Sequence, residues 1–126
     1  MFEWTKAELM MAQASLASTI RKNKKVLTTL NTKENPRQSQ ITMVRHNLTY
    51  FQLAEALINA VINDSPTPTY SEAELIETLQ ALPKFQASVE KILPKFKEGT
   101  SQHTLAIRRI RSFEIASALI KKELEA

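Results

Sequence analysis

The chain has 126 residues, of which 43% are hydrophobic and 24% are charged, and its formal net charge is +4. This length and composition suit one globular domain over residues 1–126 and exclude a disordered or low-complexity chain. The absence of cysteine excludes a small secreted domain held by disulfides, a thiolate nucleophile and any zinc site that needs sulfur ligands.

The distribution of apolar residues bears on localisation. No run approaches the ~20 apolar residues that a transmembrane helix requires. The first residues, Met1 to Trp4, lack the basic region and the apolar stretch of a signal peptide. We therefore expect a cytoplasmic protein with no transmembrane segment.

The single glycine, Gly99, leaves little material for β-hairpins or phosphate-binding loops, so we expect an all-α protein. The first helix is predicted to begin after Thr5, which with Glu8 can form a capping box, and to run to about Leu30. Its apolar residues recur every three or four positions and form one stripe. They are Leu9, Ala12, Leu16, Ile20, Leu27 and Leu30.

A second helix is predicted over about Gln40 to Asn63, after a polar loop that contains Pro36. Its apolar arc covers more than half of the helix circumference, so we expect this helix to be central and to contact more than one neighbour. The main stripe comprises Ile41, Val44, Leu48, Phe51, Ile58 and Ile62.

Two prolines interrupt the third helical region, which opens with a capping box of Ser71 and Glu74. Because proline lacks an N–H and clashes with the preceding turn, we expect this helix to be kinked or split at Pro83. Gly99 is a suitable helix stop, and Ser101 can cap a last helix that reaches nearly to Ala126. Together these patterns predict an antiparallel helical bundle of four to five helices.

Positive charge is concentrated in two stretches. Residues 21–45 hold seven basic residues against one acidic residue, a net +6, and residues 84–111 hold seven against two, a net +5. Such clusters suit a solvated helix face or a surface that attracts phosphates, anionic lipids or an acidic partner. The residues of this candidate partner surface are Arg21, Lys22, Lys24, Lys25, Arg37, Arg45, Arg108 and Arg111.

Two charged residues fall on apolar helix faces. Glu55 lies between Phe51 and Ile58 in the second helix, and Arg109 lies between Ala106 and Phe113 in the last. Because a lone buried charge costs several kcal/mol, we expect Glu55 and Arg109 to pair with each other or with another partner. The alternative is a polar pocket in which Arg109 binds a carboxylate or phosphate and Glu55 acts as an acid or base.

No known catalytic motif is present. The two histidines, His46 and His103, lack an acidic residue at helical metal-ligand spacing, and no serine follows a glycine elbow. We therefore expect no metal, no cofactor and no small-molecule ligand, and an enzyme is the less favoured interpretation.

The leading hypothesis is an adaptor or subunit that binds a macromolecular partner through its basic surface. Phe2, Trp4, Met10 and Met11 are candidate apolar anchors, equally well explained as core or as a homodimer contact. An alternative is a nucleic-acid-binding accessory protein that contacts phosphates. In architecture alone the chain also resembles bacteriocin-immunity proteins, which are compact basic helical bundles, and this resemblance implies a small membrane-proximal protein.

Overall fold

The computed structural model describes residues 4–126 and consists, over that range, of α-helices with no strand. The helices are α1 (Lys6–Asn31), α2 (Gln38–Ile62), α3 (Glu72–Ile92) and α4 (Ser101–Glu125). A short 3₁₀ turn, η1 (Leu93–Lys95), follows α3. The predicted all-helical fold and its bundle-like packing are confirmed, whereas a fifth α-helix is not found in the described residues.

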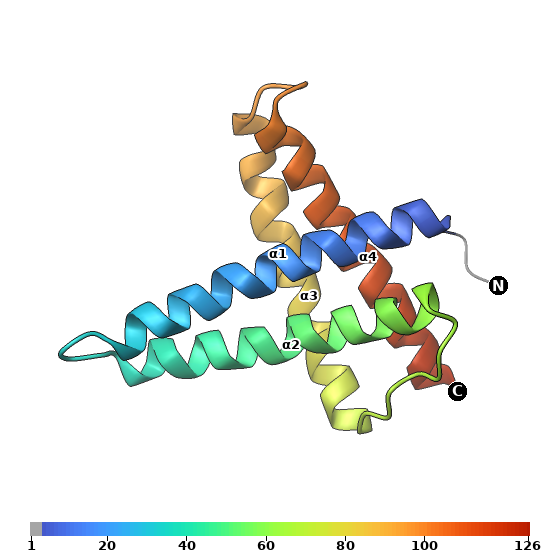
Figure 1. Ribbon diagram of the computed structural model, residues 1–126, viewed down its shortest axis with the longest axis horizontal. Helices are drawn as coiled ribbons and strands as arrows, with labels where there is room; N and C mark the ends of the chain where they lie inside the picture. Colours follow the sequence, from blue (N-terminus) through green and yellow to red (C-terminus); the bar gives the residue numbers. More distant parts are fainter. Residues whose placement is uncertain (1–3) are drawn as a thin grey trace.

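The helices form two antiparallel hairpins, α1–α2 and α3–α4, which cross one another rather than lying parallel (Figure 1). Both α2 and α4 contact all three other helices, as expected for a central second helix. In contrast, α1 and α3 lie diagonally across the structure and do not contact each other directly.

The helix starts follow the local sequence closely. Thr5 and Glu8 form the predicted capping box at α1, and Ser71 and Glu74 form the one at α3. For α4 the N-cap is Thr100 rather than Ser101, and its hydroxyl accepts a hydrogen bond from the His103 amide at 3.3 Å. Each of these caps satisfies backbone donors that a helix start leaves without a partner.

The predicted split at Pro83 is not found, because α3 runs through this residue without interruption. Pro83 itself is exposed, and its neighbour Leu82 is fully buried, so packing on the apolar side holds the helix together across the missing hydrogen bond. The helix ends instead at Ile92, just before the 3₁₀ turn that begins at Leu93 and contains Pro94 as its second residue. Gly99 lies in the following loop with a φ of 85° and does not terminate α3.

One hydrophobic cluster joins all four helices. The predicted stripe of α1 is buried except for Leu27, which is half-buried and packs against the cluster. At the centre of the crossing, the rings of Phe51, Phe85 and Phe113 come together from α2, α3 and α4. None of the helices among residues 4–126 is long and apolar enough to cross a membrane.

Candidate functional site

The two basic stretches meet where α1 crosses α4. Lys22 of the first stretch and Arg108 of the second line the same cavity, of about 160 Å³, which we call the basic cavity. Its remaining lining residues are Met11, Ala14, Ser15, Ser18, Leu105 and Arg109. The crossing of the hairpins thus joins basic residues that are more than 80 positions apart in the sequence.

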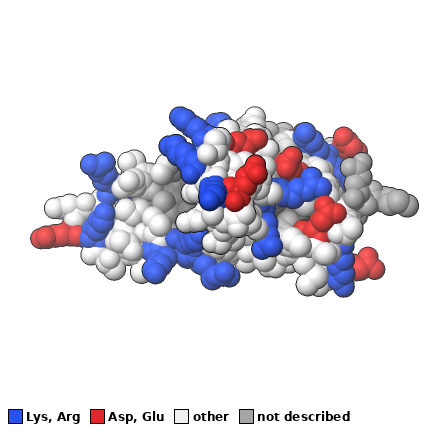
Figure 2. Space-filling model, turned by 90° about the horizontal axis from the view of Figure 1, so that it is seen from above, with Lys and Arg blue, Asp and Glu red and all other residues white. Residues whose placement is uncertain are grey.

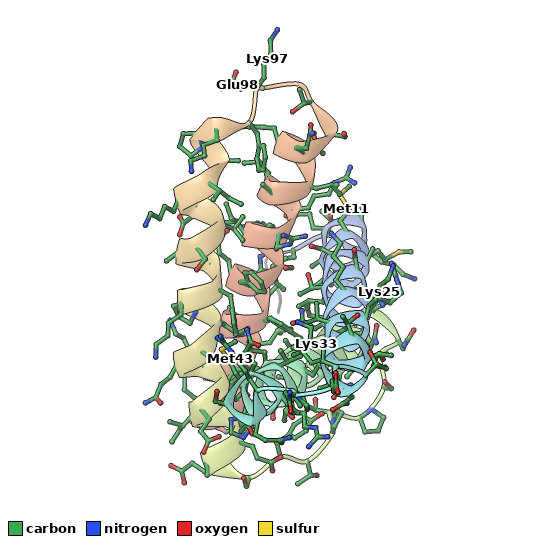
Figure 3. The ribbon with its side chains drawn as sticks, turned by 90° about the vertical axis from the view of Figure 1, so that its left-hand side faces the viewer. Met11, Lys25, Lys33, Met43, Lys97 and Glu98 are labelled. Atoms are coloured by element: carbon green, nitrogen blue, oxygen red, sulfur yellow. The ribbon has the colours of Figure 1, made fainter. Side chains whose placement is uncertain are left out.

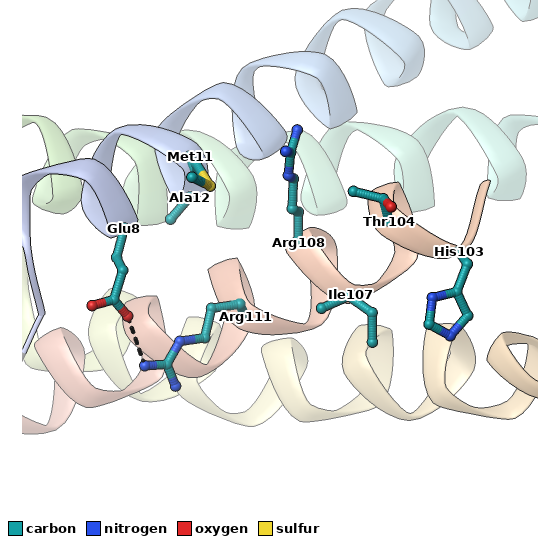
Figure 4. A pocket seen from close by; sticks show the side chains of 8 residues that line it. All are labelled: Glu8, Met11, Ala12, His103, Thr104, Ile107, Arg108 and Arg111. Carbon is teal, nitrogen blue, oxygen red and sulfur yellow. Dashed lines mark hydrogen bonds and ion pairs between the residues drawn. The ribbon is translucent and has the colours of Figure 1, made fainter. Parts of the chain in front are cut away.

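A second cavity, of about 330 Å³, continues along the same pair of helices and shares Met11 and Arg108 with the basic cavity. We call it the outer cavity. Figure 4 shows Met11 and Arg108 near its middle, the side chains of Glu8 and Arg111 at one end and His103 at the other. Most of the side chains between these two ends are apolar, including Ala12 and Ile107.

Arg111 is neutralised at the edge of the outer cavity, since its guanidinium donates to Glu8 Oε2 at 3.0 Å. A hydrogen bond from the Thr5 backbone amide, and then the bond from Arg111, hold the pKa of the Glu8 carboxyl below its usual range. In contrast, Lys22 and Arg108 form no ion pair with any residue in the described range 4–126. The basic cavity therefore holds two cations that no carboxylate within residues 4–126 neutralises.

The other predicted basic residues are exposed but do not line these two cavities. They are Arg21, Lys24, Lys25, Arg37 and Arg45. Figure 3 shows Lys33, in the turn between α1 and α2, well separated from Lys97 and Glu98 at the outer tip of the α3–α4 hairpin. Viewed toward that tip, Lys and Arg side chains are interspersed with Asp and Glu side chains instead of forming a face of one sign (Figure 2).

The four predicted apolar anchors differ in their surroundings. Met10 and Met11 are 53% and 48% exposed on α1, whereas Trp4 is half-buried and packs against the core. Phe2 lies outside the described residues. Sequence reasoning missed Leu105 and Ile107 of α4, which are 54% and 45% exposed and each line a cavity together with Met11.

Glu55 and Arg109 do not form the predicted pair. The carboxylate of Glu55 accepts a hydrogen bond from the side-chain amide of Gln13, at 3.1 Å, across the α1–α2 interface. Arg109 is half-buried as the sequence predicts, yet its Nε atom is enclosed and has no hydrogen-bond partner among the described residues. The two side chains therefore do not share an acid–base site.

A third cavity, of about 230 Å³, lies on the other side of Arg109 and spans the diagonal gap between α1 and α3. We call it the phenylalanine cavity because Phe51, Phe85 and Phe113 line it. Its polar lining residues are Thr19, Lys22, Asn23, Ser88 and Arg109.

Among residues 4–126, no three His, Asp or Glu side chains come together in a way that could hold a metal ion. Comparison with known proteins adds no function, since no family model, curated protein or solved structure matches this chain.

Proposed function

We propose that this protein is an adaptor or subunit that binds an acidic segment of a protein partner on its α1–α4 surface. This surface comprises the basic cavity, the outer cavity and the exposed side chains of Met11, Leu105 and Ile107 beside them. The observation that carries the proposal is the convergence of Lys22 and Arg108, one from each basic stretch, next to exposed apolar groups.

The chemistry of this surface favours an acidic and apolar partner. Lys22 and Arg108 have no carboxylate partner within residues 4–126, so an Asp or Glu of a bound segment would supply the missing negative charge. Met11 and Leu105, each about half exposed, would bury apolar area against the same segment. Methionine and arginine are also enriched in protein–protein interfaces relative to the rest of the surface.

The same features weigh against phosphate binding by this surface. Interfaces with nucleic acid are more polar and more positively charged than those between proteins. Here two cations alternate with Met11 and Leu105, and the carboxylate of Glu8 lies at one end of the outer cavity. A nucleic acid or an anionic membrane would therefore leave the apolar side chains poorly covered. Tighter binding of either one would contradict the proposal.

The proposal is tested by selecting random displayed peptides that bind the full chain. The affinity of the selected peptides, once labelled, is then measured by fluorescence polarisation at two salt concentrations. We expect enrichment of peptides that combine Asp or Glu with large apolar residues. Arg108→Glu should weaken their binding by at least about tenfold, because it replaces the attractive charge with a repulsive one. Met11→Ser should weaken binding by a similar factor through lost apolar contact.

Lys33→Glu is the matched control, since it makes the same change of charge on an exposed residue in the α1–α2 turn. It should leave peptide affinity within about twofold of the unaltered protein, allowing for long-range charge effects. Labelled single- and double-stranded DNA and RNA, and vesicles containing phosphatidylglycerol, are measured in parallel. The proposal fails if no acidic peptide is enriched, if Lys33→Glu is as damaging as Arg108→Glu, or if a nucleic acid or vesicle binds more tightly than every selected peptide.

A further inference from the structure

The phenylalanine cavity has a composition that the proposed docking surface does not explain. Its apolar side is made by three packed rings, with Phe51 4.7 Å from Phe85 and 6.0 Å from Phe113 between ring centroids. The cationic side chains of Lys22 and Arg109 line the same cavity. Phe51 and Phe113 are only 3% and 1% exposed, so the half-buried Phe85 is the ring that this cavity leaves accessible beside the two positive charges.

The Arg109 guanidinium lacks an acceptor. Its Nε atom is shielded from solvent but makes no hydrogen bond to any described residue, and such unsatisfied buried donors are uncommon in folded proteins. Glu55, the acidic residue expected to pair with it, is held by Gln13 and does not line the cavity. Residues 4–126 therefore present a cation here without supplying the anion.

The neutral polar groups of the cavity do not fill this role. The hydroxyls of Thr19 and Ser88 donate to the carbonyl oxygens of Ser15 and Lys84, each one turn earlier in its own helix. The side-chain amide nitrogen of Asn23 likewise donates to the Thr19 carbonyl, at 2.8 Å. These local bonds leave Lys22 and Arg109 as the groups with donors available to a ligand.

We infer that the phenylalanine cavity binds a small carboxylate that carries one aromatic ring, with its carboxylate on Arg109 and its ring against Phe85. A planar carboxylate matches the fork of N–H groups at the end of the Arg109 guanidinium. The volume of about 230 Å³ is below the ~300–1,000 Å³ of pockets for drug-sized ligands, which favours a single-ring compound. The phenylalanine cavity shares Lys22 and Arg109 with the basic cavity, but the ligand inferred here extends beyond the proposed function.

The test uses isothermal titration calorimetry of the full chain with four probes. Phenylacetate carries both the ring and the charge, phenylacetamide the ring alone, and acetate and inorganic phosphate the charge alone. We expect saturable binding of phenylacetate, with the other three at least about tenfold weaker, because each loses either the ion pair or the aromatic contact.

Two variants assign the site. Arg109→Gln should weaken phenylacetate binding by about tenfold or more, whereas Arg108→Gln removes the same charge from the adjacent residue, which does not line this cavity, and should change the affinity less than about twofold. Phe85→Leu should also weaken binding, and circular dichroism establishes that each variant is folded.

The inference is overturned if phenylacetate does not bind, if phosphate or acetate binds as well as phenylacetate, or if Arg108→Gln is as damaging as Arg109→Gln. Failure here is separable from failure of the proposed function. Peptide binding on the α1–α4 surface is measured with Arg108→Glu and Met11→Ser, and neither of these residues lines the phenylalanine cavity.

Discussion

Glu74 illustrates how a single side chain links helix formation to pH. It accepts a hydrogen bond from the Ser71 backbone amide at 3.0 Å, while its own amide donates to the Ser71 hydroxyl at 3.1 Å. The bond from the backbone amide, followed by the bond with the Ser71 side chain, lowers the pKa of the Glu74 carboxyl from its ordinary value. The folded protein thus stabilises the charged form of Glu74 more than the unfolded chain does.

A lowered carboxyl pKa stabilises the fold above the unfolded pKa of about 4.3, and this contribution is lost as pH falls through the lower folded value. We predict that Glu74→Gln, which keeps the capping geometry, reduces the slope with which the free energy of unfolding falls as the pH drops below about 4.5. Urea denaturation at a series of pH values measures this slope. Glu72→Gln removes a carboxylate from the same turn but outside the capping box, and an equal loss of slope in that variant would contradict the prediction.

Other residues indicate which features can be predicted one helix at a time. The capping boxes of Thr5 and Ser71 and the half-buried position of Arg109 follow from local spacing, and the structure contains all three. The partner of Glu55 could not be predicted, because helical periodicity does not determine how α1, α2 and α4 are aligned along their axes. Gln13 donates to Glu55, and Arg109 has no carboxylate partner within residues 4–126.

At the scale of the helices, α3 departs from the sequence expectation at Pro83. The proline removes one backbone hydrogen bond, yet Leu82 is 0% exposed and Phe85 packs against the core on the next turn. Burial of these apolar side chains outweighs the local cost of proline, so tertiary packing overrides the breaking signal. Pro94 lacks comparable support because η1 contains no buried residue, and there the helix ends.

We predict that Pro83→Ala raises the free energy of unfolding by about 1–2 kcal/mol, since the restored N–H bond outweighs the greater entropy of the unfolded chain. Pro94→Ala is the matched control, because Pro94 occupies an initial position of the 3₁₀ turn where proline is well tolerated. It should lower stability by less than about 1 kcal/mol. Chemical denaturation of both variants gives these values, and a clear loss of stability in Pro83→Ala would show that the proline is required for the packing of α3.

At the scale of the whole molecule, the crossing of the hairpins creates the candidate sites. In the simplest bundle the four helices lie side by side, and that arrangement does not by itself bring Lys22 close to Arg108. Loop lengths alone do not decide between aligned and crossed hairpins. The crossing brings α1 onto α4, which joins the two basic stretches, and separates α1 from α3, which leaves the phenylalanine cavity between them. Both sites thus depend on contacts between hairpins that periodicity within each helix cannot reveal.

The same crossing implies that neither hairpin is stable alone. Phe113 of α4 is 1% exposed and stacks on Phe51 of α2 at a ring-centroid distance of 6.0 Å, so the aromatic centre of the core belongs to both hairpins. We predict that Phe113→Ala lowers the free energy of unfolding by about 3–5 kcal/mol, a large share of the 5–15 kcal/mol typical of such proteins. Met43→Ala, at a position 53% exposed, should cost less than about 1 kcal/mol.

Whether the protein unfolds in one cooperative step tests the shared core more directly than the size of the free energy of unfolding does. Because each hairpin completes the core of the other, loss of helix by circular dichroism and exposure of Trp4 by fluorescence should coincide in urea, in both the unaltered protein and Phe113→Ala. If α1–α2 had an independent core, the Phe113 variant would instead lose helix in two steps, with the Trp4 signal changing in the later one. Coincident transitions would establish that the sites formed between the hairpins persist for as long as the molecule is folded at all.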